Sequence, residues 1–417
     1  MNKLNKECII PISETTDFTI ENLPMGIFSY KDKNKKLGMA IGEYVVDLEY
    51  LWRKGLLDRI FDKNVFDSNT LNKFIATGKN KWSLTRKKIQ SLLTGKHPKF
   101  TKTKKEWLLL QQKVILHFPL KVGDYTDFYS SEAHAANVGR LFRKNEDPLL
   151  PNWKHMPIAY HGRSSSLMLS GSPIIRPWGQ ILNKQNEPEF HPTKSLDFEL
   201  ELAMVIGKST KNGTPININN AKEHLFGFVL LNDWSARDIQ RWEYQPLGPF
   251  LGKNFATTIS PWVVTMEALE PFLCDGQIQN PPVLSYLTQN KGMHLDINLE
   301  VTLTTNKQNK LKITGTNSKN IYWSFAQQLA HHTINGCNVN IGDLMASGTI
   351  SGEKEGEWGS LLEISFNGTK ALKIENESRT FIEDGDSISI NGIAENKEFR
   401  VGFGSLENKV LPALKME

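Results

Sequence analysis

Seven residues, Leu196–Leu202, alternate strictly between apolar and acidic side chains: Leu-Asp-Phe-Glu-Leu-Glu-Leu. Successive side chains of a β-strand point to opposite faces, so a strand here places Asp197, Glu199 and Glu201 on one face. The apolar face demands burial, and buried carboxylates without partners are costly. The stretch therefore predicts carboxylates that are protonated, salt-bridged or bound to a metal. A solvent-facing acidic edge strand, or plain pairing with Lys and Arg, is the alternative.

A second polar stretch follows an apolar run at residues 230–244, which read Leu-Leu-Asn-Asp-Trp-Ser-Ala-Arg-Asp-Ile-Gln-Arg-Trp-Glu-Tyr. Its acidic, basic, amide and phenolic side chains recur at helical spacing, just after what looks like a buried strand. A loop punctuated by Gly and Pro then adds a lysine and a threonine. Carboxylates that need a cation, followed by groups that could bind an oxyanion, predict a reaction centre. Its candidate residues are Asp233, Arg237, Gln240, Tyr244, Lys253 and Thr257.

A third candidate lies in residues 122–139, which are dense in polar and aromatic side chains. His134 stands where Ser130 or Ser131 could cap a short helix. Its unperturbed pKa of about 6.5 suits a general base acting on water. Glu363, which alternates with apolar neighbours, could orient the imidazole. A turn that carries a hydrogen-bonded surface histidine is the alternative.

These groups suggest a specific chemistry. Three or four carboxylate ligands without nearby Cys or His favour a hard cation, Mg²⁺ or Ca²⁺, over zinc. Such an ion could polarise a carbonyl or clamp a chelating dioxygen substrate. Arg237, Gln240 and Lys253 would then stabilise developing negative charge. Because no GxSxG motif and no activated cysteine is present, water is the predicted nucleophile.

Elements read from the pattern are mostly strands. Short apolar runs broken by Gly predict hairpins over residues 18–48, whereas apolar residues at three-to-four spacing predict amphipathic helices from 51 to about 116. Residues 297–315 and 381–411 are typical of hairpins, and 322–332 of a helix. No parallel βαβ series occurs, so an antiparallel, roll-like or barrel-like β domain is expected.

Length and composition place the chain among ordinary globular proteins. Its 417 residues, 39% hydrophobic and 23% charged, suit two domains at the rough rule of about 100–200 residues each. We predict a boundary near Pro119 and Lys121, hence domains at 1–120 and 121–417. No apolar run reaches the roughly 18 residues of a membrane span, and the start lacks a signal-peptide pattern. We therefore expect a cytoplasmic protein with no membrane partner.

Positive charge is concentrated in the N-terminal third, where residues 1–120 hold 22 Lys and Arg against 12 Asp and Glu. Lysines cluster at 31–36, 79–88 and 96–105. A nucleic-acid surface is one interpretation, but few aromatics are interleaved and no DNA-binding motif accompanies them, so a solvated basic surface is favoured. The cysteines lie far apart without a CxxC pattern, which predicts reduced thiols rather than disulfides or structural zinc. They are Cys8, Cys274 and Cys337.

Five longer motifs extend the argument. They are Asp124-Tyr-Thr-Asp-Phe-Tyr-Ser-Ser, Leu230-Leu-Asn-Asp-Trp-Ser-Ala-Arg-Asp-Ile-Gln, Pro246-Leu-Gly-Pro-Phe-Leu-Gly-Lys, Ser347-Gly-Thr-Ile-Ser-Gly and Arg400-Val-Gly-Phe-Gly. Together these motifs resemble the fumarylacetoacetate hydrolase family, from about residue 122 to 414. Over the first 120 residues the resemblance is looser, although Asn22-Leu-Pro-Met-Gly-Ile-Phe also looks like the start of that family.

The resemblance implies a mainly β fold with some helix: a small SH3-like N-terminal barrel, then a β-roll catalytic domain, in a homodimer. It implies metal-dependent hydrolysis of the carbon–carbon bond of 4-fumarylacetoacetate, a β-diketo acid, to fumarate and acetoacetate, as in tyrosine and phenylalanine breakdown. A related acylpyruvate hydrolase or decarboxylase is the nearest alternative. A non-enzymatic protein that binds nucleic acid through its basic surface is a remote one.

The resemblance also assigns residues. Calcium ligands match Asp127, Glu199, Glu201 and Asp233, so Asp127 replaces Asp197 of the alternation argument. A second, magnesium site matches Asp233, Lys253 and Thr257; an ammonium cannot ligate a cation, so the lysine contributes its backbone carbonyl or lies adjacent. The general base matches His134 and its orienting partner Glu363. The groups that stabilise the leaving carbanion match Arg237, Gln240 and Lys253. Substrate-binding positions match Tyr129, Arg143, Tyr160, Gln240, Tyr244 and Thr349.

Overall fold

The structure is a computed structural model that describes residues 7–31, 34–95, 106–143, 145–398 and 400–416. The lysine cluster at 96–105, and part of the one at 31–36, lie outside these residues. Within the described part, none of the helices combines the length and the apolar character needed to cross a bilayer.

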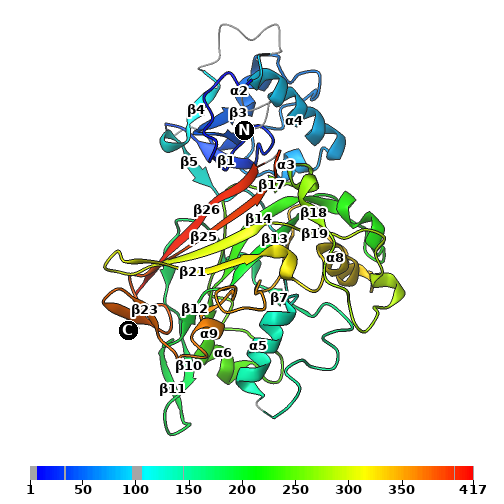
Figure 1. The fold of residues 1–417 in the computed structure, drawn as a ribbon. Helices are drawn as coiled ribbons and strands as arrows, with labels where there is room; N and C mark the ends of the chain where they lie inside the picture. Colours follow the sequence, from blue (N-terminus) through cyan, green and yellow to red (C-terminus); the bar gives the residue numbers. More distant parts are fainter. Residues whose placement is uncertain (1–6, 32–33, 96–105, 144, 399, 417) are drawn as a thin grey trace.

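A five-stranded antiparallel sheet dominates the N-terminal part of the chain, seen in blue and cyan in Figure 1. Its order is β4-β3-β2-β1-β5, and Gly42, with φ of 52°, makes the tight turn between β2 and β3. The hairpins expected over residues 18–48 are confirmed. The strands are β1 Met25–Ser29, β2 Lys36–Ile41, β3 Tyr44–Asp47, β4 Leu108–Leu110 and β5 Ile115–His117.

Three helices share a hydrophobic core with this sheet: α2 Leu48–Arg53, α3 Asn72–Ile75 and α4 Lys79–Leu93. The predicted helical section is thus right as far as α4 and wrong at β4 and β5. Both of those strands are three residues long, so their apolar runs carry no period. Pairing with β3 and β1, which are remote in sequence, decides their conformation.

An eight-stranded sheet forms the centre of the molecule, in the order β7-β6-β22-β13-β14-β16-β8 with β17 also paired to β14. Every residue of β13 and β14 is buried, which explains their almost continuous apolar character. β22 lies parallel to β6 and antiparallel to β13. The strands are β6 Tyr125–Phe128, β7 Ala159–Gly162, β8 Leu167–Leu169, β13 Leu200–Ile206, β14 Leu225–Asp233, β16 Thr257–Ile259, β17 Val264–Thr265 and β22 Leu344–Ala346.

A second five-stranded sheet, ordered β21-β20-β25-β26-β9, packs on the central one and contains both predicted C-terminal hairpins. The two sheets approach closely at Gly392, where a Cβ atom would lie 2.9 Å from Cδ2 of Leu230 in β14. A larger residue there would require the Leu230 side chain to move. The strands are β9 Ile174–Ile175, β20 Asn298–Thr304, β21 Lys310–Asn317, β25 Ser387–Glu395 and β26 Arg400–Leu411.

Shorter elements complete the fold below and beside the sheets (Figure 1). The expected helix at 322–332 is confirmed as α8. The helices are α5 Glu132–Phe142, α6 Arg237–Glu243, α7 Met266–Leu269, α8 Phe325–Thr333 and α9 Leu361–Ile364. The strand pairs are β10 Trp178–Leu182 with β11 Pro188–Pro192, β12 Leu196–Asp197 with β15 Ser235–Ala236, β18 Leu273–Cys274 with β19 His294–Leu295, and β23 Leu372–Ile374 with β24 Glu377–Arg379.

The N-terminal part and the central sheet share a core. The Trp82 ring of α4 packs edge-on against Phe226 of β14 at a centroid distance of 4.9 Å, and Phe74 of α3 contacts the same ring at 6.3 Å. A Cβ atom at Gly207 would lie 2.7 Å from the Trp82 ring. The contact between the two parts is therefore an apolar core.

His294 of β19 makes stability depend on pH. Its Nε2 lies 3.1 Å from the carbonyl oxygen of Ile321, and Nδ1 is buried without a hydrogen-bond partner among the described residues. Burial lowers the pKa of His294 to about 4, although Asp275 opposes the shift. The folded ring stays neutral while the unfolded ring takes up a proton, so stability is lost as pH falls from 6.5 toward 4.

At pH 5.5 we expect His294 to lower the free energy of unfolding by about 1.4 kcal/mol relative to pH 7.5. Urea unfolding at both pH values measures this difference in the free energy of unfolding. The His294→Gln variant should lack the part of the difference that His294 contributes. The matched variant His155→Gln replaces an exposed histidine and should leave it in place. Equal pH dependence in wild type and His294→Gln would contradict the assignment.

Candidate active site

Four buried carboxylates lie close together where several interior strands of the central sheet begin or end. Asp127 lies in β6, Glu201 lies in β13, and Asp233 is the last residue of β14. Glu199 is the residue immediately before β13. One oxygen of each lies within 4.8 Å of the others. The structure thus brings together the four residues that the resemblance selected.

Strand register explains why residues so distant in sequence meet. β22 ends at Ala346, which pairs with Asp127 on one side and Ala203 on the other. Near that end, the carboxylates of Asp127 in β6 and Glu201 in β13 lie within 4.8 Å of each other. Gly348 has φ of 76°, and a Cβ atom there would lie 2.1 Å from the carbonyl oxygen of Phe128. Glycine is therefore required, and its N–H donates to Oε2 of Glu201 at 3.1 Å.

Asp197 does not join the cluster, so the alternation argument was wrong at this residue. The strand is interrupted, because β12 ends at Asp197 and β13 starts at Leu200. The Asp197 carboxylate accepts hydrogen bonds from Nε of Arg237 at 2.8 Å and from the N–H groups of Leu361 and Leu362 at 2.7 and 2.9 Å. It caps the start of α9 and holds Arg237.

The cluster has the character of a cation site. Oδ1 of Asp127 and Oε1 of Glu201 are buried and have no hydrogen-bond partner among the described residues. Burial, with the charges of Asp233 and Glu199, raises the pKa of Asp127 well above its ordinary value, and burial with neighbouring carboxylates does the same for Glu201. Repelling carboxylates with free oxygens suit a hard divalent metal ion.

Lys253 supplies positive charge to the cluster. Its Nζ lies 2.6 Å from Oε2 of Glu199 and 2.6 Å from Oδ2 of Asp233. Burial favours the neutral amine, but these carboxylates outweigh it and raise the pKa of Lys253 above its usual range. The side chain is a donor and cannot be a ligand. Thr257 Oγ1 donates to Asp233 Oδ1 at 2.9 Å. The Tyr160 hydroxyl lies 2.9 Å from Oδ2 of Asp127 and 2.9 Å from Oδ2 of Asp233, and its single proton can be donated to one of them.

Three further candidates lie on α6 or directly after it. The sequence placed Asp233 at helical spacing with Arg237, Gln240 and Tyr244, but Asp233 is the last residue of β14, and the helix begins at Arg237. Arg237 Nη1 lies 2.7 Å from Oε1 of Glu199 and 3.2 Å from Oε1 of Gln240, and its Nη2 is buried without a partner among the described residues. That free N–H faces no protein acceptor and is available to an anion. Tyr244, just after the helix, is 48% exposed.

His134 and Glu363 form a buried pair. Nδ1 of His134 lies 2.7 Å from Oε2 of Glu363. Ser131 is the N-cap of α5, and its hydroxyl accepts from the His134 N–H at 3.3 Å, so that expectation is confirmed. Glu363 lies in α9 and not in a strand, because Ser360 caps a single helical turn there. Burial alone would raise the pKa of Glu363, but the His134 charge and hydrogen bonds hold it below its ordinary value.

The remaining candidates surround this pair less tightly. The Tyr129 ring packs edge-on against His134 at a centroid distance of 5.4 Å. Arg143 ends α5 and donates through Nη2 to the carbonyl oxygen of Pro148, while its Nε is buried and has no partner among the described residues. Thr349, in the segment after β22, is 2% exposed. Most sequence candidates thus contact the carboxylate cluster or the His134–Glu363 pair, namely Tyr129, Tyr160, Arg237, Lys253 and Thr257, and Gln240 contacts Arg237. Within the described part of the chain, the contacts of Arg143, Tyr244 and Thr349 do not join them directly to either group.

Comparison with known proteins agrees with this geometry. A family model for the C-terminal part of fumarylacetoacetate (FAA) hydrolase matches residues 124–411, and one for the N-terminal part of fumarylacetoacetase matches residues 21–119. The chain belongs to the fumarylacetoacetate hydrolase family. The predicted mainly β fold of this family is confirmed.

Similar proteins extend over the whole chain. A fumarylacetoacetase of Dictyostelium discoideum is 48% identical and aligns over 98% of this chain and 98% of its own length. One of Homo sapiens is 46% identical over 97% of this chain and 99% of its own. The structure of a fumarylacetoacetate hydrolase from Exiguobacterium antarcticum, 17% identical, covers 94% of this chain and 99% of its own with a TM-score of 0.54, and so shares the fold.

Sequence reasoning missed the residues that hold the pair in this family member. Asn137, Ser351 and Ser360 all donate to the Glu363 carboxylate. Asn137 lies one helical turn after His134, so its spacing on α5 was a usable signal. The two serines come from a Gly-rich turn and a helix cap, which local pattern does not connect with an active site.

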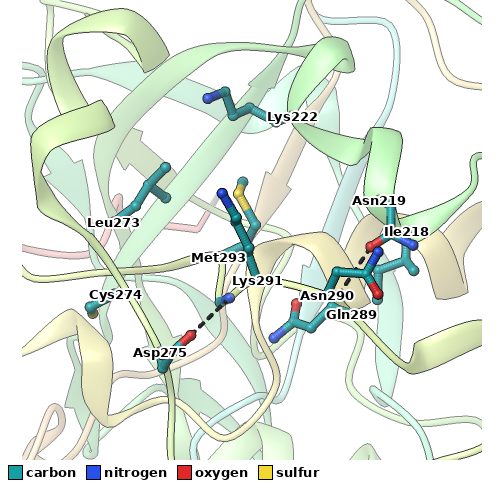
Figure 2. Close-up of a pocket in the computed structure, with 11 residues that line it drawn as sticks. Ile218, Asn219, Lys222, Leu273, Cys274, Asp275, Gln289, Asn290, Lys291 and Met293 are labelled. Atoms are coloured by element: carbon teal, nitrogen blue, oxygen red, sulfur yellow. Dashed lines mark hydrogen bonds between the residues drawn. The ribbon is translucent and has the colours of Figure 1, made fainter.

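An open hollow lies elsewhere, beside β18. It has a volume of about 580 Å³, and Figure 2 shows Asp275, Lys291 and Asn290 around it. Two side chains of its lining accept from backbone groups: Asp275 accepts from the N–H of Gly292 at 2.9 Å, and Asn219 from that of Asn290 at 3.1 Å. Among the described residues, no cluster of metal-ligating groups lies there. The buried carboxylate cluster is therefore the better candidate.

Proposed function

We propose that this chain hydrolyses the carbon–carbon bond of 4-fumarylacetoacetate to give fumarate and acetoacetate, the last step of tyrosine and phenylalanine breakdown. The observation that carries the proposal is the buried His134–Glu363 pair beside a four-carboxylate cluster, in a chain 48% identical to a fumarylacetoacetase along nearly its full length. A hydrolase of this kind needs a base for water and positive groups for a leaving enolate, and the cluster's surroundings supply both.

We assign the metal ligands to Asp127, Glu199, Glu201 and Asp233. The buried oxygens of Asp127 and Glu201 that have no partner among the described residues support a hard cation, and we propose Ca²⁺. A metal held by these residues would supply a Lewis acid that polarises the carbonyl groups of the diketone substrate. We further propose a magnesium site at Asp233, Lys253 and Thr257, where the lysine would use its backbone carbonyl because its side chain is committed to the carboxylates.

His134 acts as the general base in this proposal. Glu363 accepts from Nδ1–H, which leaves Nε2 of the neutral ring free to take a proton from water. The oxygen of that water adds to the carbonyl carbon of the fumaryl group. The bond from this carbon to the CH₂ carbon of the acetoacetate part then breaks, and its electron pair leaves with acetoacetate. The proton that His134 took from water goes to that CH₂ carbon, so the products are fumarate and acetoacetate.

Three groups stabilise the departing negative charge: Arg237, Gln240 and Lys253. Arg237 is suited to this because its buried Nη2 points at no protein acceptor, and a desolvated donor acts strongly on a developing anion. We place the substrate against Tyr129, Arg143, Tyr160, Gln240, Tyr244 and Thr349. The buried Nε of Arg143 offers a further donor for a substrate carboxylate.

Metal dependence gives the first test. Purified protein should release fumarate from 4-fumarylacetoacetate, a chelator should abolish release, and Ca²⁺ or Mg²⁺ should restore it to an extent that identifies the ion. Metal added to stripped protein at about 100 times its Kd should stabilise the fold by about 2.7 kcal/mol in thermal unfolding. Glu201→Gln should lose both effects, whereas Glu300→Gln, on an exposed residue, should keep both. Fumarate release that persists in chelator would overturn the metal assignment.

We also propose the division into domains at 1–120 and 121–417, a homodimer, and a cytoplasmic location. The two family models, which meet between residues 119 and 124, support the division. Three free cysteines support a reducing compartment. Size-exclusion chromatography with light scattering tests the dimer.

A further inference from the structure

The Glu363 carboxylate is held on both of its oxygens. Oε2 accepts from Nδ1 of His134 at 2.7 Å, from Oγ of Ser351 at 2.9 Å and from Oγ of Ser360 at 2.8 Å. Oε1 accepts from Nδ2 of Asn137 at 2.9 Å. Glu363 is 2% exposed, so these donors replace water around a buried charge.

The directions of the two serine bonds follow from their other partners. Oγ of Ser351 accepts from the N–H of Gly359 at 2.9 Å, and Oγ of Ser360 accepts from the N–H of Glu363 at 3.4 Å. Each hydroxyl proton is therefore free to be donated to the carboxylate. Both serine bonds reach the same oxygen as His134, and neither reaches Oε1.

The orientation of Asn137 is set in the same way. Nη1 of Arg140, one turn further along α5, donates to Oδ1 of Asn137 at 3.0 Å. An arginine can only donate, so Oδ1 is the acceptor and Nδ2 faces Glu363. α5 and α9 lie side by side in Figure 1, and this amide joins them at the active site.

We propose that Asn137 is a positioning residue for the reaction: by donating to Oε1 it fixes the plane of the Glu363 carboxylate, and through it the ring of His134. This inference rests on the proposed function. A carboxylate held through one oxygen can rotate about its last bond, whereas one held through both cannot. Without Asn137, Oε1 would be a buried charged oxygen lacking its donor, and the group would turn to find another.

Two substitutions of Asn137 separate hydrogen bonding from shape. Asn137→Leu keeps the approximate size and removes the donor; we expect kcat to fall about tenfold, the typical worth of a hydrogen bond to a charged group, with KM changed less than about twofold. Asn137→Asp keeps the shape but puts an oxygen against Oε1. At pH 8 we expect its kcat to fall further than that of Asn137→Leu, because two carboxylates then repel.

The pH dependence of the aspartate variant provides a signature that a packing role would not produce. Two carboxyl groups in contact share one proton, so as pH falls the new side chain becomes a donor to Oε1. The ratio of kcat for Asn137→Asp to that of wild type should therefore rise toward acid pH, while the ratio for Asn137→Leu stays flat. Glu363 and Arg140 contact this position directly, and His134 contacts Glu363. The hollow that Asn137 lines also contains the charged side chains of Glu132, Lys319, Glu353, Lys354 and Glu357.

The outcomes are distinct. If Asn137→Asp equals wild type at pH 8 and Asn137→Leu is impaired, Asn137 acts by shape and the proposal is overturned; it is also overturned if both keep full kcat. Thermal unfolding checks that each variant folds, and Asn80→Leu, an exposed position on α4, is the matched control. If wild type itself releases no fumarate, the proposed function fails; if wild type is active, the Asn137 results judge the positioning role alone.

Discussion

His134→Ala is expected to lower kcat for fumarate release by about 10³-fold, within the range for loss of a general base, with little change in KM. The reason is that Nδ1 of His134 is hydrogen-bonded to Glu363 at 2.7 Å, so Nε2 is the ring atom that can accept a proton. Alanine at this position would leave water without that proton acceptor. Steady-state kinetics on purified, metal-loaded protein measures the effect.

A matched control is His155→Ala, which removes an exposed histidine and should leave kcat unchanged. Thermal unfolding should show that His134→Ala retains the fold, since the caps of α5 and α9 come from Ser131 and Ser360. Full activity in a folded His134→Ala protein would exclude His134 as the base and leave the carboxylate cluster as the remaining source of the chemistry.

Asp197→Ala is expected to lower the free energy of unfolding by about 3–5 kcal/mol, the usual cost of removing one partner of a buried ion pair. The side chain is fully buried and accepts from Nε of Arg237 and from the N–H groups of Leu361 and Leu362. Its loss leaves the Arg237 charge short of one partner and the N–H groups of Leu361 and Leu362 without their acceptor, although Ser360 still caps α9. Urea unfolding at pH 7.5 measures the change.

Activity should fall in the same variant, because Arg237 and the helix that carries Glu363 lose a common anchor. The control is Glu300→Ala, from an exposed pair with Lys312, which should cost less than about 1 kcal/mol. Asp197→Ala protein that remains folded should still be stabilised by metal. Loss of that stabilisation, with the carboxylate cluster otherwise unchanged, would mean that Asp197 is a ligand after all.

Much of the fold could be predicted because its strands are long enough to carry a period. β20 alternates between exposed and buried residues and pairs with β21 as a hairpin, as expected. β4 and β5 could not be identified in this way. Each spans three residues, and their conformation depends on partners more than 60 residues away along the chain, β3 for β4 and β1 for β5.

The residues of the candidate site were also predicted only in part. Composition and spacing marked carboxylates, a histidine and a cationic group as reactive types, and the family resemblance chose among them. Neither revealed Asn137, Ser351 or Ser360, since their role depends on where α9 lies against α5. An asparagine on a helix and a serine in a turn are ordinary residues until a buried carboxylate lies within hydrogen-bonding distance.

Residues 196–202 show both what the sequence alone predicts and what depends on the tertiary structure. By itself, its alternation predicted that the acidic side chains of Glu199 and Glu201 lie on one face, because the period of a strand is two. It left open whether that face is buried or exposed to solvent. The family resemblance left the third acid out of the metal ligands, but only the tertiary structure shows what it does: the strand breaks between Asp197 and Leu200, so Asp197 accepts hydrogen bonds from the start of α9 and from Arg237. The place that alternation assigned to it is taken by Asp127, which β22 brings across the sheet from β6.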